Sequence, residues 1–137
     1  MTHDLMPPFK SQITFLYYKD LTLAQRFYED VMGFALAEDQ GWAKIYHITG
    51  QAFVGIVDEA RGSLKVKENS AVMLTLVTDD VRGWYDYLRQ QGIKVVREYG
   101  FSEEIQVEYC FFEDPGGYVI EIEKFHKPEL AETFDLD

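Results

Sequence analysis

The sequence contains a single cysteine, Cys110, among its 137 residues. One thiol cannot form a disulfide within the chain, nor can it supply a cluster of thiolate metal ligands. Because Cys110 lies in an apolar run, we expect it to be a small buried side chain. The sequence therefore excludes a fold stapled by internal disulfides and a metal centre built from several cysteines.

Long apolar runs and basic residues are also scarce. No run approaches the roughly 20 residues of a membrane-spanning helix, and residues 1–10 lack the charged-then-apolar pattern of a signal peptide. We therefore expect a cytoplasmic protein without a membrane contact. Lys and Arg number 13 against 24 Asp and Glu, for a net charge of −11. Since phosphate backbones attract clusters of Lys and Arg, nucleic acid is not an expected partner.

One hydrophobic pattern occurs twice along the chain. It consists of a β-branched and aromatic strand, an amphipathic helix that follows an aspartate, and three further strands. In the first copy the strands are predicted at residues 13–18, 34–37, 42–48 and 52–57, with the helix at 21–33. In the second copy they are predicted at residues 72–77, 93–96, 105–112 and 118–124, with the helix at 81–92.

Each predicted helix has an apolar stripe at helical spacing, which indicates the face that packs on a sheet. The predicted stripes are Leu23, Ala24, Phe27, Tyr28 and Val31 in the first helix, and Val81, Trp84, Tyr85 and Leu88 in the second. Asp20 and Asp80 match as helix starts, and Gly33 and Gly92 match as helix ends.

The repeat predicts an α+β fold of two βαβββ modules, which form curved mixed sheets around a cup. Neither module alone could cover both faces of its sheet, so the inward residues of both would line that cup. The predicted organisation is an N-terminal leader (1–10), the first module (11–57), a linker (58–70), the second module (71–125) and an acidic C-terminal tail (126–137).

Two stretches of the repeat resemble a known family. They are YYKDLTLAQRFYEDVMGF near the start and FFEDPGGYVIEIEKF near the end. With them, the sequence resembles the vicinal oxygen chelate superfamily, which includes glyoxalases, bleomycin-resistance proteins and extradiol dioxygenases. The resemblance implies the paired-module fold and a homodimer. It does not specify a function, because one fold carries many unrelated sites.

In the metal enzymes of that family, four ligands stand on the inner strands: a His on the first strand and a Glu on the last strand of each module. The resemblance places these positions at Ile13, Gly55, Met73 and Glu121. Only Glu121 could bind a metal ion, whereas a catalytic site usually needs three protein ligands. We therefore predict no cofactor and a chain that lacks the family's metal site. A divalent metal at displaced ligands such as His47 and Glu108 remains the alternative.

The inward residues of the predicted strands are mostly aromatic or aliphatic, and Gly55 is predicted to leave space among them. Aromatic rings can hold a flat molecule, and a carboxylate can pair with its positive charge. Taken singly, an aromatic side chain on an inner face is more often part of the core, and the alternative role for Glu121 is that of an inert residue. The predicted ligand-binding residues are Phe15, Tyr17, Trp42, His47, Phe53, Met73, Tyr109 and Glu121.

Three hypotheses for the function follow. The first is a metal-independent protein that binds and sequesters a small hydrophobic or cationic molecule, as resistance proteins do. The second is a lyase, isomerase or dioxygenase that uses displaced metal ligands, or Glu121 as the catalytic general base. The third is a regulatory or structural dimer without a small ligand.

Overall fold

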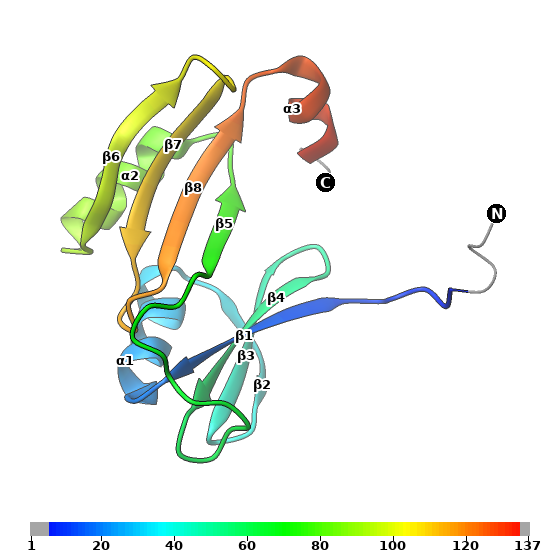
Figure 1. The fold of residues 1–137 in the computed structure, drawn as a ribbon, viewed down its shortest axis with the longest axis vertical. Coiled ribbons are helices and arrows are strands. Elements are labelled where there is room, and N and C mark those ends of the chain that lie inside the picture. The colour runs from blue at the N-terminus through cyan, green and yellow to red at the C-terminus, as the bar shows by residue number, and fades with distance from the viewer. Residues whose placement is uncertain (1–5, 135–137) are drawn as a thin grey trace. The chain divides into compact units, whose positions relative to one another are not determined.

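The computed structural model describes residues 6–134, which belong to two compact units that meet in sequence between Val66 and Lys67 (Figure 1). The first unit contains β1 (Gln12–Tyr18), α1 (Leu21–Arg26), the π-helical turn η2 (Phe27–Val31), β2 (Ala35–Asp39), β3 (Ala43–Thr49) and β4 (Ala52–Asp58). The second contains β5 (Met73–Val77), α2 (Val81–Gln90), β6 (Val95–Ser102), β7 (Val107–Glu113), β8 (Val119–Phe125) and α3 (Pro128–Phe134).

Each unit is built on a four-stranded mixed sheet of the same topology. The strand orders are β1-β4-β3-β2 and β5-β8-β7-β6. In each sheet the first strand of the unit lies at an edge, and the last strand of the unit is its inner neighbour. Those two strands run parallel, and the other neighbours are antiparallel. The predicted α+β fold with two βαβββ modules is confirmed.

The alternation of side chains divides each sheet into two faces. The even-numbered residues of the inner strands pack against the helices, and we call this the even face. In the first unit it contributes Leu16, Tyr18, Tyr46, Val54 and Ile56, all at most 2% exposed. The opposite side, formed by odd-numbered residues, is called the odd face below.

The first helix buries a stripe that differs slightly from the predicted one. Ala24, Phe27, Tyr28 and Met32 are buried, whereas Leu23 is 45% exposed. The buried stripe is centred on Ala24, and Leu23 is about 100° away from it around the helix axis. Val31 is half-buried, because the chain widens into a π turn that brings Met32 onto the sheet instead.

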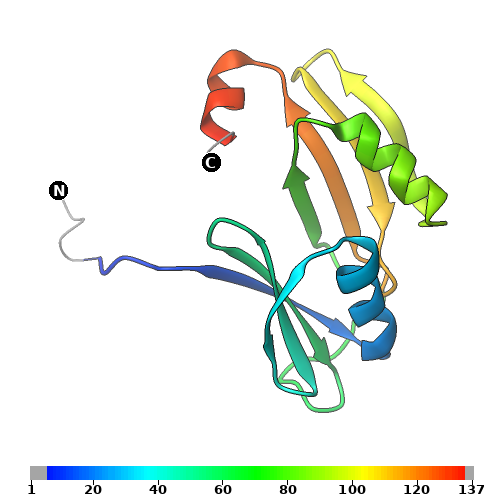
Figure 2. The same cartoon turned by 180° about the vertical axis from the view of Figure 1, so that it is seen from behind.

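In the second unit, α2 crosses the even face of its sheet, as the view from behind shows (Figure 2). Val81, Tyr85 and Leu88 are buried there, as predicted. Trp84 is only half-buried. With Tyr87, Asp80 and Gly83 it lines a shallow hollow of about 370 Å³.

The turn before the last strand is ordered by Asp114, which is 4% exposed. Its Oδ1 accepts hydrogen bonds from the backbone N–H groups of Gly116 and Tyr118, both at 2.9 Å. Gly117 has φ of 88°, a conformation that glycine adopts without steric cost. This turn therefore sets the start and the register of β8.

Residues 1–5 of the predicted leader and 135–137 of the predicted tail lie outside the described residues. Within residues 126–134 the chain forms α3, whose Phe134 stacks on Phe125 of β8 with ring centroids 4.7 Å apart. No helix within the described part of the chain has the length and apolar character needed to cross a bilayer.

Candidate functional site

Two glutamates stand side by side on the odd face of the second sheet. In the β8 sequence VIEIEKF, Ile120 and Ile122 point to the helix side, so Glu121 and Glu123 point to the other. Both glutamates are buried, with exposed fractions of 9% and 8%. The strand alternation alone places two carboxyl groups within reach of each other.

Hydrogen bonds hold this carboxyl pair. The hydroxyl of Thr75, which is the register partner of Glu121 on β5, donates to Glu121 Oε1 at 3.0 Å. Glu123 is hydrogen-bonded to Glu121. Burial, followed by this hydrogen bond and the negative charge of Glu121, raises the pKa of Glu123 from 4.5 to about 7. Glu123 therefore keeps its proton up to near neutral pH.

The glutamates have no cationic partner among the described residues, since no Lys, Arg or His there lies within ion-pair distance of either. Burying a carboxylate without a counter-charge is costly, and the protein meets this cost by keeping a proton. A bound cation could take the place of that proton. Chemically, the pair can therefore bind a positive group or transfer a proton.

Aromatic rings flank the glutamates on β7. Phe111 is the register partner of Glu121, and Tyr109 that of Glu123. The two rings are 6.1 Å apart, edge to face. Beyond them on β6, the guanidinium carbon of Arg97 lies 4.7 Å from the Phe111 centroid and 6.0 Å from that of Tyr109. The odd face of the second sheet therefore joins a carboxyl pair to an aromatic surface.

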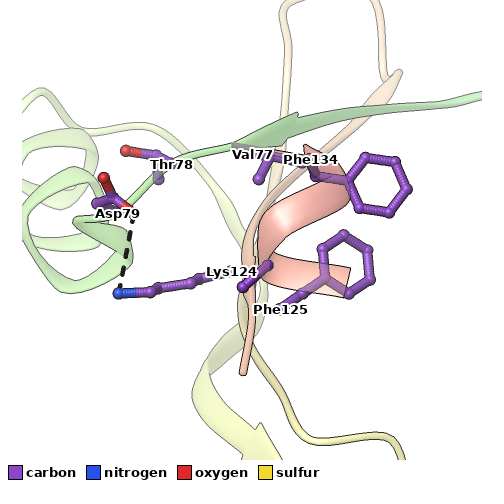
Figure 3. Close-up of a pocket in the computed structure, with 7 residues that line it drawn as sticks. Val77, Thr78, Asp79, Lys124, Phe125 and Phe134 are labelled. Atoms are coloured by element: carbon purple, nitrogen blue, oxygen red, sulfur yellow. Dashed lines mark ion pairs between the residues drawn. The ribbon is translucent and has the colours of Figure 1, made fainter. Parts of the chain in front are cut away.

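A small cavity of about 70 Å³ lies near the Glu123 end of this face (Figure 3). Val77 is the register partner of Glu123 and lines the cavity with Phe125 and Phe134, whose rings lie against each other. Lys124 reaches Asp79 at 3.9 Å. Helix α3 therefore lies at one end of the odd face of the second sheet.

The odd face of the first sheet holds four of the predicted ligand-binding residues: Phe15, Tyr17, His47 and Phe53. The ring of Phe15 covers Gly55 so closely that a Cβ there would lie 2.3 Å from its Cδ1. The space predicted at Gly55 is therefore filled, and that expectation was wrong. The His47 ring is 5.2 Å from Phe53, and its Nε2 lies 2.8 Å from the Gly50 carbonyl oxygen. His47 is held as a turn-bonded strand residue.

Tyr17 also lies against Gly62, in the loop that follows β4. The remaining predicted residues divide between the two units. Trp42 lies in the first, where the guanidinium carbon of Arg61 is 5.9 Å from the centroid of the Trp42 ring. Met73, 47% exposed, begins β5 on the odd face of the second sheet. The structure thus groups Met73, Tyr109 and Glu121 in one unit and the other predicted residues in the other.

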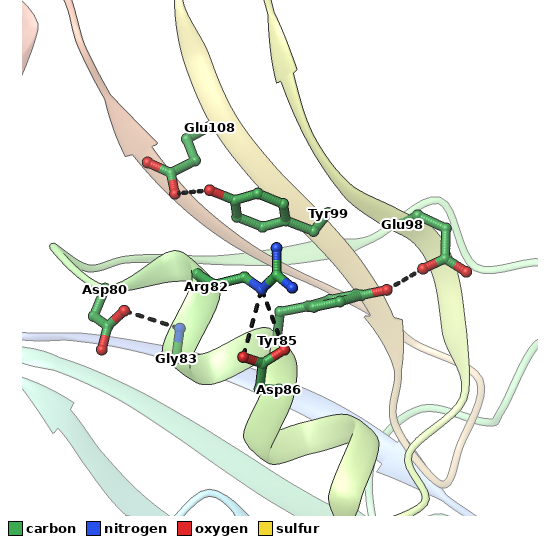
Figure 4. A network of polar contacts seen from close by, with 8 residues as sticks. All are labelled: Asp80, Arg82, Gly83, Tyr85, Asp86, Glu98, Tyr99 and Glu108. Carbon is green, nitrogen blue, oxygen red and sulfur yellow. Dashed lines mark hydrogen bonds and ion pairs between the residues drawn. The ribbon is translucent and has the colours of Figure 1, made fainter.

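Glu108, which was considered as a displaced metal ligand, lies on the even side of β7. It accepts a hydrogen bond from the Tyr99 hydroxyl, and the Nε2 of His126 is 2.9 Å from its Oε1. Figure 4 shows the Tyr99–Glu108 hydrogen bond, and it shows Arg82 between the rings of Tyr85 and Tyr99. The Arg82 contacts hold α2 against β6. The carboxylate of Glu108 is already engaged by Tyr99 and His126.

The residues at the four ligand positions implied by the resemblance do not fit a metal ion. Ile13 and Met73 offer no hard donor, Gly55 lies beneath a phenyl ring, and Glu121 already binds Thr75. Within residues 6–134, no three His, Cys, Asp or Glu side chains gather as metal ligands would.

The predicted set of ligand-binding residues did not include Glu123, Thr75, Phe111 or Arg97. The first three could have been added from the sequence, because side-chain alternation from Glu121 and strand pairing lead to them directly. Arg97 had no such signal. Its register with Phe111 depends on two irregularities in the pairing of β6 with β7, which a sequence pattern does not reveal.

Comparison with known proteins places this site in context. The family described as the Glyoxalase/Bleomycin resistance protein/Dioxygenase superfamily matches residues 11–122. The uncharacterised protein YraH of Bacillus subtilis (strain 168) is 32% identical over 121 residues, covering 88% of this chain and 92% of YraH.

Solved structures share the fold. A glyoxalase/bleomycin resistance protein/dioxygenase from Nocardioides has 16% identity and a TM-score of 0.71, covering 92% of this chain and 91% of its own. Lactoylglutathione lyase from Agrobacterium tumefaciens has 22% identity and a TM-score of 0.68, covering 86% and 95%. At these identities the likeness concerns the fold alone.

Proposed function

Because this chain belongs to the Glyoxalase/Bleomycin resistance protein/Dioxygenase superfamily, we propose that it binds a small cationic molecule without the divalent metal of the family's metal enzymes. The site is the odd face of the second sheet. The observation that carries the proposal is the buried pair Glu121 and Glu123, which has no counter-charge among the described residues and lies beside two aromatic rings.

The charge distribution supports a positive ligand. Residues 67–137 carry 16 acidic and 7 basic side chains, whereas residues 1–66 carry 8 and 6. The negative charge is thus concentrated in the unit that holds the carboxyl pair. Such a field raises the local concentration of cations and accelerates their association. Phe111 and Tyr109 supply the flat apolar surface on which an aromatic cation can stack.

Benzamidine and benzamide test this proposal as a matched pair, since they share one shape and differ in charge. We expect isothermal titration calorimetry to show benzamidine binding at least tenfold tighter than benzamide. Glu123→Gln should weaken benzamidine by about tenfold or more, because one carboxylate of the pair is lost. The variant Glu104→Gln, in an exposed turn, serves as the control.

Metal dependence is tested in the same titration. Dialysis against EDTA should leave benzamidine binding unchanged, because no metal is proposed at the site. Equal affinity for benzamidine and benzamide would overturn the cation proposal, and loss of binding after EDTA would overturn metal independence.

Sequestration, as the biological role, predicts that the bound molecule is released chemically unaltered, which mass spectrometry checks. The homodimer that the family resemblance implies stays a prediction for analytical ultracentrifugation.

A second candidate is a metal-free isomerase or lyase in which Glu121 is the general base. The raised pKa of Glu123 favours it, because it places a protonated carboxyl beside a carboxylate near neutral pH. Such an enzyme would exchange an acidic C–H of its substrate with solvent. Proton NMR in D₂O of compounds that bind the wild type, with Glu121→Gln as the comparison, detects that exchange.

A further inference from the structure

A row of register partners crosses the second sheet and holds both a positive and a negative side chain. The registers join Arg97 on β6 to Phe111 on β7, Phe111 to Glu121 on β8, and Glu121 to Thr75 on β5. Two strand spacings, roughly 10 Å in all, separate the Cα atoms of Arg97 and Glu121. A flat ring, that of Phe111, lies between them.

Arg97 is available to a ligand. It is exposed, and no carboxylate of residues 6–134 lies within ion-pair distance of it. Its contacts are with the rings of Phe111 and Tyr109, at 4.7 and 6.0 Å. Stacking on a ring leaves the N–H donors at the edge of the guanidinium plane free, and these donors bind carboxylates and phosphates in pairs.

At the other end of the row, Glu121 and Glu123 are nine-tenths buried and also lack an opposite charge among the described residues. The row therefore has an unmatched cation at one end, unmatched carboxyls at the other and an aromatic surface in between. Resting on the proposed function, we propose that the site takes a zwitterion, with a flat apolar spacer between a cationic group and an anionic group.

In this arrangement the cationic group of the ligand faces Glu121 and Glu123. Its flat part lies along the side chains of Phe111 and Tyr109, beside the guanidinium that stacks on them, and its anionic group accepts hydrogen bonds from the N–H donors of Arg97. Arg97 therefore acts as a specificity-determining residue, since it selects molecules with a carboxylate or phosphate at the far end. A simple cation meets only half of the site.

The probes are 4-amidinobenzoate and its methyl ester, which share the amidinium and the ring but differ in the negative charge. We expect the wild-type protein to bind the acid about tenfold tighter than the ester in calorimetry at pH 7.5. Arg97→Gln should remove that preference and leave the affinity for the ester within about twofold. Glu123→Gln should weaken both probes.

Arg89→Gln is the matched control, because Arg89 also stacks on a ring, that of Tyr85, but on the helix side of the sheet. It should retain the preference for the acid. An equal or weaker affinity for the acid in the wild type would overturn the proposal and leave the cation site standing. Equal weakening of both probes by Arg97→Gln would also overturn it, since Arg97 would then only support Phe111. If the ester, the acid and benzamidine all fail to bind, the proposed function itself is wrong.

Discussion

Replacement of Glu123 by Gln tests the raised pKa of Glu123 directly, through the pH dependence of stability. The pKa of Glu123 is raised from 4.5 to about 7, chiefly by burial and then by Glu121. The folded protein therefore binds more protons than the unfolded chain between these pH values. The resulting stabilisation is fully present below pH 4.5 and is lost as the pH rises through 7.

The magnitude follows from the size of the pKa difference. Each pKa unit corresponds to about 1.4 kcal/mol, so the effect on the free energy of unfolding is at most about 3.5 kcal/mol. Relaxation of the pair and partial access of water reduce it to about 1–2 kcal/mol. Glutamine is neutral at every pH and can still donate a hydrogen bond to Glu121, so it mimics the protonated carboxyl.

We therefore expect the two proteins to have similar stability at pH 5. At pH 8 the Glu123→Gln variant should be more stable than the wild type by about 1–2 kcal/mol. Urea unfolding between pH 5 and 8.5, followed by tryptophan fluorescence, measures this difference, because Trp42 and Trp84 report on one unit each.

Glu104→Gln, which removes an exposed carboxylate, is the control and should follow the wild-type curve within about 0.5 kcal/mol. Equal destabilisation by Glu123→Gln at all pH values would contradict a raised pKa of Glu123 in the folded protein. So would a gain in stability of the wild type over the variant between pH 5 and 8, because Glu123 would then be a stabilising anion.

Three further measurements test side-chain packing within the two units. Gly55→Ala puts a Cβ 2.3 Å from the Phe15 ring, and we expect urea unfolding to show a free energy of unfolding lower by about 1–3 kcal/mol. Adding Phe15→Ala to the same chain should largely restore it, because the clashing ring is removed. Tyr46→Phe removes the 2.7 Å hydrogen bond from a fully buried hydroxyl to Glu29 and should cost about 1.5–3 kcal/mol in the same assay. Burial raises the pKa of Cys110 to about 12, so Ellman's reagent at pH 8 should label it only after unfolding, and rapid labelling of the native protein would contradict its placement.

Much of the fold follows from patterns that act locally. A strand alternates its side chains whatever its neighbours are, so the sides taken by Ile120 and Glu121 were predictable. Asp20 and Asp80 cap their helices as predicted, because an aspartate before a helix accepts its free N–H groups. The predicted stripe at Leu23 was less accurate, because the π turn that follows α1 changes which residues reach the sheet.

The candidate site was harder to predict, because its residues come from four strands. Phe15 and Gly55 were both assigned to the inner face, yet only their side-by-side register shows that the ring fills the space of the missing side chain. Likewise, His47 and Glu108 bond to nearby partners that the linear sequence does not indicate. Side-chain partners across strands depend on register, which a single residue of slippage changes completely.

The sequence by itself determined the repeat, the superfamily and the placement of two glutamates on one face of the last strand, because these depend on local periodicity and on motifs within short stretches. Only the tertiary structure decided that Glu121 and Glu123 are buried together without a cation among the described residues, and that Arg97 ends their row. Burial depends on every strand around a residue, and the position of Arg97 depends on irregular pairing between β6 and β7.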